Sequence, residues 1–196
     1  MKKLFVLLFI STIVLVGCGS SGNFEAQTNW EVSDFDYDNQ RGESVSLEDL
    51  KGTVWLSTFI FTDCETVCPP MTYNMSDIQA MLSEKGIEDY KVVAFSVDPE
   101  VDTPEKLQEY IANYDVIDES KWELLTGYTQ EHISGFAADS FKTLVRDDPN
   151  TNQVIHGTSF YLVDQNGTVV KNYSGTTDVP TEEIVIDVET LIEDGK

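Results

Sequence analysis

The sequence is short of basic residues, histidines and cysteines, and each shortage narrows what the chain can do. It has 12 lysines and arginines against 35 aspartates and glutamates, so its formal net charge is −23. A surface of this charge repels nucleic acid and anionic lipid headgroups, and we therefore expect no nucleic-acid partner. The same charge attracts metal ions and basic protein surfaces, although a role in solubility alone is the simpler interpretation.

The apolar run at the N-terminus is too short to span a membrane. It covers the thirteen residues 4–16, whereas a spanning helix needs roughly 20. Lys2 and Lys3 precede the run, which is typical of a signal peptide, here residues 1–17. Leu15-Val16-Gly17-Cys18 resembles a bacterial lipobox, in which cleavage before the cysteine leaves a lipid on Cys18. We therefore expect an exported, lipid-anchored protein, with an uncleaved signal anchor as the alternative.

Only three cysteines are present, and a lipid on Cys18 leaves Cys64 and Cys68 as the remaining thiols. A disulfide between residues four apart closes a very short loop and adds little stability, so a structural staple is a weak explanation. If the two residues lie one helical turn apart, their Cα atoms are roughly 6 Å from each other. That separation permits a disulfide, and it also lets two thiolates bind one metal ion. The pair therefore indicates redox chemistry, soft-metal binding or both.

The rest of the chain favours one domain behind a short linker. Residues 19–29 are rich in glycine, serine and asparagine, so we expect residues 18–29 to form a flexible tether. No internal repeat and no second linker follow. The length suits a single domain, which we expect over residues 30–196.

The pattern of apolar residues predicts alternating strands and helices within this domain. A polar turn at 39–42 splits residues 35–47 into a hairpin, and Asn166-Gly167 marks a second hairpin turn. The predicted strands are residues 54–61, 90–97, 122–126, 141–145, 159–163 and 168–173. The predicted helices are residues 69–85, 104–114, 129–138 and 180–193, with a short turn at 46–51. This order predicts an α/β domain with a central mixed β-sheet flanked by helices and an N-terminal β-hairpin.

The two cysteines occupy a position with chemical meaning in such a fold. They follow the predicted central strand at residues 54–61 and directly precede a predicted helix. A dithiol at this point favours a thioredoxin-like fold. A thiolate at a helix N-terminus faces unpaired N–H groups and the positive end of the helix dipole, which lowers its pKa.

Only two histidines are available as nitrogen ligands. His132 lies among polar residues in a short predicted helix, so we expect it to be a solvated residue without a role. His156 precedes an apolar strand, at the end of the sheet that faces the dithiol in a thioredoxin-like fold. Cys64, Cys68 and His156 would then supply two thiolates, one imidazole and one open position. A catalytic zinc site also has three protein ligands, but soft thiolates with an imidazole favour copper over zinc.

Three segments together resemble the Sco/SenC family, and the resemblance covers nearly all of residues 30–193. They are Phe61-Thr62-Asp63-Cys64-Glu65-Thr66-Val67-Cys68-Pro69, Ser96-Val97-Asp98-Pro99-Glu100-Val101-Asp102-Thr103-Pro104 and Val154-Ile155-His156-Gly157-Thr158-Ser159. The C-x-x-x-C-P motif combined with one distant histidine is specific, although neither part is specific alone. The resemblance implies a thioredoxin-like copper protein that helps to assemble the dinuclear CuA centre of cytochrome c oxidase.

The same resemblance implies a role for each candidate residue. Cys64 and Cys68 are carried over as thiolate ligands and as a redox-active dithiol, and His156 as the nitrogen ligand, for copper as Cu(I) or Cu(II). Lipid attachment at Cys18 would replace the transmembrane anchor found elsewhere in the family. The implied protein is a lipid-anchored metallochaperone at the extracytoplasmic face of a bacterial membrane. Its implied partners are the CuA-bearing oxidase subunit and a thiol reductant protein.

An enzymatic interpretation stays open beside the metallochaperone. In it, the dithiol is a thiol–disulfide oxidoreductase that reduces the CuA-site cysteines of the oxidase subunit. Thioredoxin-type enzymes use C-x-x-C, whereas this chain has one more residue between its cysteines, which favours metal binding. Asp98, at the end of a predicted buried strand, either orients His156 as a carboxylate partner or serves as an ordinary turn residue.

Overall fold

The structure is a computed structural model of the chain, and it describes residues 24–195. The expected signal peptide, residues 1–17, and the expected lipid attachment site Cys18 lie outside the described residues. Within the described part of the chain, no helix combines the length and the apolar composition that a membrane span requires.

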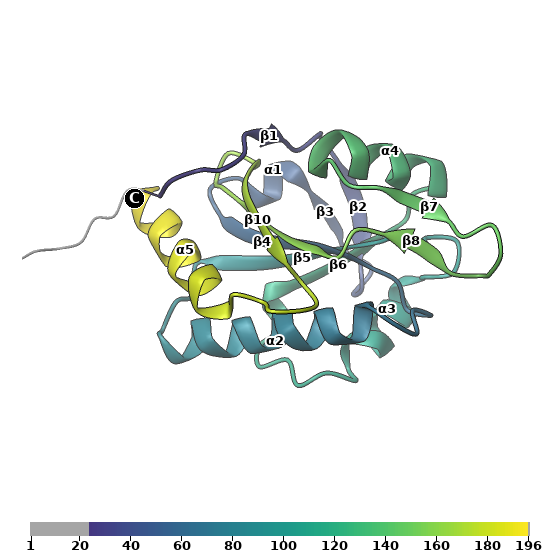
Figure 1. Cartoon of the computed structure of the whole chain (residues 1–196), viewed down its shortest axis with the longest axis horizontal. Helices are drawn as coiled ribbons and strands as arrows, with labels where there is room; N and C mark the ends of the chain where they lie inside the picture. Colours follow the sequence, from purple (N-terminus) through teal and green to yellow (C-terminus); the bar gives the residue numbers. More distant parts are fainter. Residues whose placement is uncertain (1–23, 196) are drawn as a thin grey trace, which may run out of the picture.

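A mixed sheet of eight strands forms the centre of the described domain (Figure 1). Across the sheet the strands follow the order β1-β10-β9-β4-β5-β6-β2-β3. They are β1 (Trp30–Glu31), β2 (Asp36–Asn39), β3 (Ser44–Ser46), β4 (Val54–Ile60), β5 (Tyr90–Ser96), β6 (Trp122–Thr126), β9 (Ser159–Val163) and β10 (Thr168–Ser174). β4, β5 and β6 run parallel, and the other pairings are antiparallel. The predicted central mixed sheet is confirmed.

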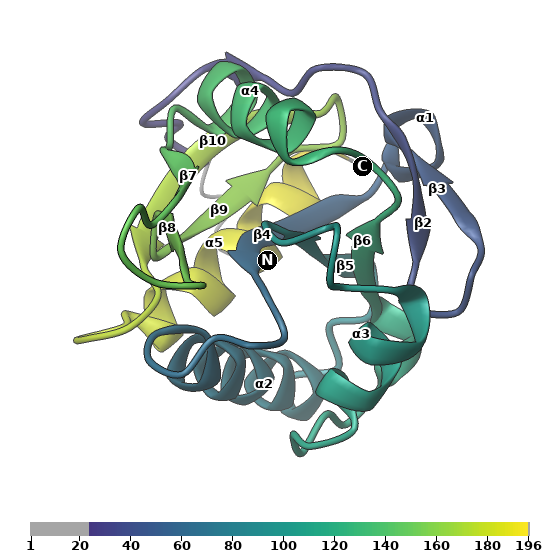
Figure 2. The ribbon, with the colours of Figure 1, turned by 90° about the vertical axis from the view of Figure 1, so that its right-hand side faces the viewer.

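Helices cover both faces of this sheet. In Figure 2, α4 lies on one side of the sheet, and α2 and α5 lie on the other. The helices are α1 (Leu47–Leu50), α2 (Cys68–Glu84), α3 (Pro104–Ile111), α4 (Gln130–Phe141) and α5 (Thr181–Asp194), with a 3₁₀ turn at Glu119–Lys121. Because both faces are covered, β4 is buried at all seven positions, which explains its continuous apolar run in the sequence.

A second, two-stranded sheet projects from the main one. β7 (Val145–Asp147) pairs antiparallel with β8 (Val154–His156). The predicted strand at 141–145 begins too early, because the buried face of α4 continues to Phe141 and the strand runs over Val145–Asp147. The predicted polar loop follows it at residues 148–153. Lys142 then ends the helix in a left-handed conformation, with φ of 54°.

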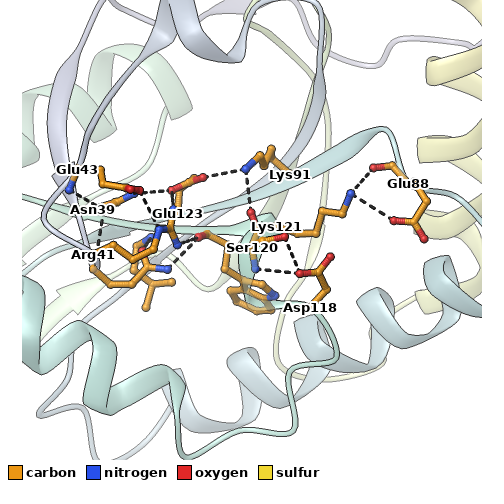
Figure 3. A network of polar contacts seen from close by, with 12 residues as sticks. Asn39, Arg41, Glu43, Glu88, Lys91, Asp118, Ser120, Lys121 and Glu123 are labelled. Atoms are coloured by element: carbon orange, nitrogen blue, oxygen red, sulfur yellow. Dashed lines mark hydrogen bonds and ion pairs between the residues drawn. The ribbon is translucent and has the colours of Figure 1, made fainter.

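The N-terminal hairpin is confirmed, and a buried carboxylate fastens it to the sheet (Figure 3). β2 pairs with both β3 and β6. The side chain of Glu123 on β6 is only 7% exposed and binds Arg41 and Lys91, the latter at 2.9 Å. Glu123 also accepts a hydrogen bond from the amide of Asn39 at 2.8 Å. The network therefore joins the hairpin turn to β5 and β6 at one end of the sheet.

The folded domain begins earlier than the sequence predicts. The N–H of Phe24 donates to Asp194 at 2.6 Å, and the N–H of Gln27 donates to the carbonyl of Val170 at 2.8 Å. Phe24 also packs against the core. Residues 24–29 therefore lie along β10 and the end of α5, and the expectation that they form a free tether is wrong. The remainder of the expected tether lies outside the described residues.

Candidate metal centre

The two cysteines lie between β4 and α2. Cys68 is the first residue of α2, and two prolines follow it in the first turn, where a missing N–H loses no hydrogen bond. Cys64 lies in the preceding loop, so the two residues do not share a helix face, and the predicted helix begins one residue earlier than expected, at Cys68. Cys64 is nevertheless close, because the N–H of Cys68 donates to its Sγ at 3.3 Å.

The two thiols differ in exposure and in protonation. Cys68 is fully buried and Cys64 is 8% exposed, and neither forms a disulfide. A hydrogen bond from Cys68 lowers the pKa of Cys64, and further hydrogen bonds from the N–H groups of Cys68 and Thr66 act in the same direction, against the opposing effect of burial. The hydrogen bond to Cys64, together with burial, raises the pKa of Cys68. The pair therefore holds a thiolate on Cys64 and a thiol on Cys68.

His156, the last residue of β8, completes the site from a distant part of the chain. Its Nε2 lies 3.4 Å from Sγ of Cys68. Its Nδ1 lies 2.9 Å from the carbonyl of Gly157, and because a carbonyl only accepts, the proton is on Nδ1. This leaves the Nε2 lone pair directed at the sulfurs. Its ring also meets the edge of Phe61, with centroids 5.8 Å apart.

Gly157 allows the chain after β8 to come close to the residues after α4. A Cβ at this position would lie 2.0 Å from Oγ1 of Thr143, so any other residue would push the two segments apart. The carbonyl that fixes the ring of His156 belongs to the same glycine. The position of the imidazole therefore depends on a residue without a side chain.

One group of metal-ligating side chains gathers within the described residues: Cys64, Cys68 and His156, whose ligand atoms all lie within 4.8 Å of one another. The spatial expectation from the sequence, that a late histidine meets the two sulfurs, is confirmed. Their use as metal ligands remains a prediction.

Asp102 is the residue beside the site that the sequence interpretation missed. Its side chain is fully buried and accepts hydrogen bonds from the hydroxyls of Thr62 and Ser96, each at 2.6 Å, and from the N–H of Thr62 at 3.2 Å. Burial raises its pKa. Asp102 ties the start of the dithiol loop to the end of β5. The sequence signal was its place in an Asp-rich segment before the Thr103 N-cap, but such residues usually serve only the turn.

Asp98, the candidate partner of His156, has other neighbours. Its N–H donates to the hydroxyl of Ser96 at 3.1 Å, and among residues 24–195 its carboxylate makes no hydrogen bond to the imidazole. Partial burial raises its pKa, and the nearby carboxylates of Asp102 and Asp63 raise it further. The orienting role considered for Asp98 therefore belongs to a backbone carbonyl, and the alternative of a turn residue remains for Asp98.

His132 is not part of the site. Its side chain is exposed, as expected, but it is not without contacts, because Nε2 lies 2.6 Å from the hydroxyl of Tyr37 and the ring stacks on Phe136. It contributes to the aromatic packing around α4. This makes it a useful control for variants of His156.

The arrangement permits two kinds of chemistry. Two sulfurs and one imidazole nitrogen can converge on one soft metal ion with only small side-chain movements. A thiolate next to a thiol can also be oxidised to a disulfide or attack one. These uses exclude each other at any moment, because a disulfide removes both thiolate ligands.

Comparison with known proteins gives consistent matches over the described domain. The SCO1/SenC family model matches residues 24–193. A SCO1/SenC family lipoprotein from Bacillus anthracis is 46% identical, with a TM-score of 0.80 over 85% of this chain and 98% of that one. BsSco, a cytochrome c oxidase assembly protein with a disulfide switch, is 48% identical, with a TM-score of 0.77 over 84% and 95%.

A more distant structure carries a metal. Copper-bound ScoI from Bradyrhizobium japonicum is 25% identical, with a TM-score of 0.69 over 82% of this chain and 99% of that one. Together with the two closer structures, it confirms the thioredoxin-like fold class that the sequence predicts.

Proposed function

Because the chain belongs to the SCO1/SenC family, we propose that it binds copper through Cys64, Cys68 and His156 and serves the assembly of cytochrome c oxidase. The observation that carries the proposal is the convergence of three soft or borderline donors within 4.8 Å. Thiolates and imidazole suit copper better than harder cations. The copper-bound ScoI structure and the described role of BsSco support the same assignment.

The protein's own residues do three things for the metal. Cys64 offers a sulfur that is already ionised, so binding there releases no proton. Cys68 must release its proton to solvent as the metal enters, because Nε2 of the adjacent imidazole keeps its lone pair for the metal. The bond from Nδ1 to the Gly157 carbonyl holds the ring in the tautomer whose Nε2 can bind. The copper ion would be cargo, and the protein would deliver it to the CuA site of the oxidase or prepare that site to receive it.

The second candidate function is thiol–disulfide exchange on the CuA-site cysteines of the oxidase subunit. The observation in its favour is the split protonation of the pair, with a thiolate to attack and a buried thiol to resolve the mixed disulfide. The disulfide switch described for BsSco is consistent with such a use. In this role the protein would need a thiol reductant to regenerate Cys64 and Cys68.

We further propose that the domain is held at the extracytoplasmic face of the cell membrane by a lipid on Cys18. The support is the lipobox-like segment at residues 15–18 and the likeness to a Bacillus anthracis lipoprotein. The folded domain at residues 24–195 would then follow the anchor after only a few residues.

A copper titration of the reduced full chain tests the metal proposal. We expect one equivalent to bind with thiolate-to-copper charge-transfer absorption, and His156→Ala to weaken binding by at least about a hundredfold, since even outer partners of ligands are worth 10–100-fold. His132→Ala is the matched control and should bind like the wild type. Equal binding by the reduced and the disulfide forms would refute the proposal.

Turnover separates the two functions. The rate at which the protein reduces a disulfide substrate should be compared between the wild type and His156→Ala. If His156→Ala reduces the disulfide substrate as fast as the wild type and also assembles the oxidase in cells as well as the wild type does, thiol exchange is the function and copper binding is not.

A further inference from the structure

Strand β8 has one edge that carries no partner strand. Its other edge pairs with β7. Beside this pairing the N–H of Asp148 donates to the carbonyl of Gln153 at 2.9 Å, so in the same register the next hydrogen-bonded pair is Arg146 with Ile155. Hydrogen-bonded pairs alternate in an antiparallel ladder, so Ile155 directs its N–H and C=O toward β7. The backbone groups of Val154 and His156 therefore point away from β7.

No other element of the described part of the chain occupies this edge. Among residues 24–195, no hydrogen bond from another strand or loop reaches the N–H or C=O groups of Val154 and His156. Such an unpaired edge is a ready template for an added strand. Figure 2 shows the β7–β8 hairpin and the loop before α2 at the same end of the sheet.

A groove of about 360 Å³ lies between β8 and the dithiol loop. Its lining includes Cys64, Thr66, Val67, Val154, Ile155 and His156. Ile155 is 38% exposed and Val67 is half-buried, so the groove offers apolar surface to alternate side chains of an extended segment. A segment lying there would pass directly over the Cys64 thiolate.

The rim of the groove is acidic. Glu65 and Asp148 line it, Asp63 adjoins Cys64 in the chain, and Asp147 directly precedes Asp148. The charge of Arg146 helps to lower the pKa of Asp148, but none of these carboxylates forms an ion pair among the described residues. The charge complement of this rim is a cationic chain.

We infer that the free edge of β8 is a docking strand, to which an extended, lysine- or arginine-bearing segment of a partner protein adds as a further strand. The added strand pairs with Val154 and His156 and presents a cysteine to Cys64. Only the cysteine rests on the proposed function, since the unpaired edge, the apolar lining and the acidic rim are independent of copper. The occupant is thus recognised by backbone pairing and charge.

A trapped complex tests the pairing. The full chain with Cys18→Ala and Cys68→Ser leaves Cys64 as its one thiol. The probe is a nine-residue peptide of alternating lysine and valine whose central cysteine carries a 2-nitro-5-thiobenzoate disulfide. The Cys64 thiolate attacks the peptide sulfur, the new disulfide joins peptide to protein, and the nitrothiobenzoate thiolate leaves, so no other oxidant is needed.

Amide hydrogen exchange in the trapped complex gives the readout. We expect exchange at Val154 and His156 to slow by about tenfold or more, while Ile155, already bonded to β7, does not change. A trapped peptide that leaves both amides unprotected overturns the inference. Protection of these amides without peptide, rising with protein concentration, would mean that a second copy of β8 is the occupant and would also overturn it.

Backbone methylation of the probe sharpens the result. Methylating the amides of one alternate set of peptide residues should slow trapping about tenfold, and methylating the other set should have little effect, because only every second residue faces β8. Equal effects from both sets would contradict strand addition.

The charge of the rim is tested separately. Glu65→Gln should slow trapping of the lysine peptide at low salt and speed trapping of a glutamate version, whereas Glu182→Gln on α5 should do neither. Equal rates for the two peptides with the wild type would contradict a cationic occupant. No metal is present in these experiments, so their failure refutes the docking strand and leaves the copper titration untouched.

Discussion

Each end of the sheet has a buried carboxylate, and the two carboxylates differ in their partners. At the end where β5 and β6 begin, the buried carboxylate of Glu123 is neutralised by Arg41 and Lys91 (Figure 3). At the end where β4 and β5 finish, the buried carboxylate of Asp102 has only hydrogen bonds from hydroxyl and N–H groups. Among residues 24–195, it forms no ion pair.

This difference assigns a role in stability to the first end and a role in ligand chemistry to the second. Paired charges at the first end fasten the N-terminal hairpin to the sheet. At the second end, a thiolate, an imidazole lone pair and several carboxylates gather, and among residues 24–195 none of these carboxylates forms an ion pair, as is expected of a site that receives a cation. Ligand sites of α/β sheets commonly lie beyond the carboxyl ends of the parallel strands, and this chain follows that rule.

The largest expected effect concerns the reactivity of the two cysteines at the second end. At pH 6 an ordinary thiol is less than about 1% ionised, but the pKa of Cys64 is lowered, so its thiolate persists as pH falls toward that value. We expect iodoacetamide to modify Cys64 at least about a hundredfold faster than Cys68, which is buried and has a raised pKa.

A variant identifies the cause of this reactivity. The hydrogen bond from Cys68 is the largest influence on Cys64, so Cys68→Ala should slow alkylation of Cys64 at pH 6 by about tenfold or more. Peptide mapping after alkylation measures both residues. Comparable rates at the two cysteines of the wild type would show that the thiolate is not confined to Cys64.

The next effect concerns the first end of the sheet. Glu123→Ala leaves Arg41 and Lys91 without their shared partner, and since both remain about a third exposed we expect a loss of about 2 kcal/mol in the free energy of unfolding. Urea denaturation measures it. Copper affinity should not change, because the network lies at the opposite end from the site.

The exposed pair between Lys85 and Glu189 supplies the control. Lys85→Ala should cost less than about 0.5 kcal/mol, as is usual for surface ion pairs. If Glu123→Ala costs no more than this, or if it also weakens copper binding, the separation between the two ends is wrong.

The smallest effect is a change with pH at Asp102. Burial raises its pKa in the folded state above its unfolded value, so its contribution to stability is greatest at low pH and falls as pH rises through the folded-state pKa. Asn would place an amide NH₂, which is a donor, against the donor groups of Thr62 and Ser96. Asp102→Asn should therefore lower the free energy of unfolding by about 1–2 kcal/mol at low pH. The deficit should shrink as pH rises.

Thermal or urea unfolding between pH 4 and pH 7 measures the deficit. Asp77→Asn, at an exposed position of α2, is the matched control. A deficit for Asp102→Asn that grows with pH would mean that the buried carboxylate is stabilised rather than penalised by its surroundings.

The sequence predicted the parts of this molecule that depend on local pattern. The continuous apolar run of β4, the Asn-Gly turn between β9 and β10, and the N-terminal hairpin are all confirmed. The end of α4 was missed because Phe141 can be read equally as the close of a helix or the opening of a strand. Only its packing in the folded domain decides between them.

The candidate site, like the fold, could be predicted from the sequence only in part. The pairing of two cysteines with His156 followed from a motif and one remaining histidine, but its supporting groups did not. Asp102 holds the start of the dithiol loop through Thr62, which lies 40 residues earlier in the chain, whereas the Gly157 carbonyl fixes the ring of the adjacent His156. A single sequence does not show either contact, and it offered Asp98 only as a candidate beside the simpler interpretation of a turn residue.

X-ray absorption spectroscopy of the copper-loaded protein tests the central claim most directly, because it counts the atoms bound to the metal. The account predicts two sulfur ligands and one imidazole nitrogen, with the nitrogen contribution lost in His156→Ala and retained in His132→Ala. A copper ion surrounded by nitrogen and oxygen alone, or a spectrum that His156→Ala leaves unchanged, would contradict it.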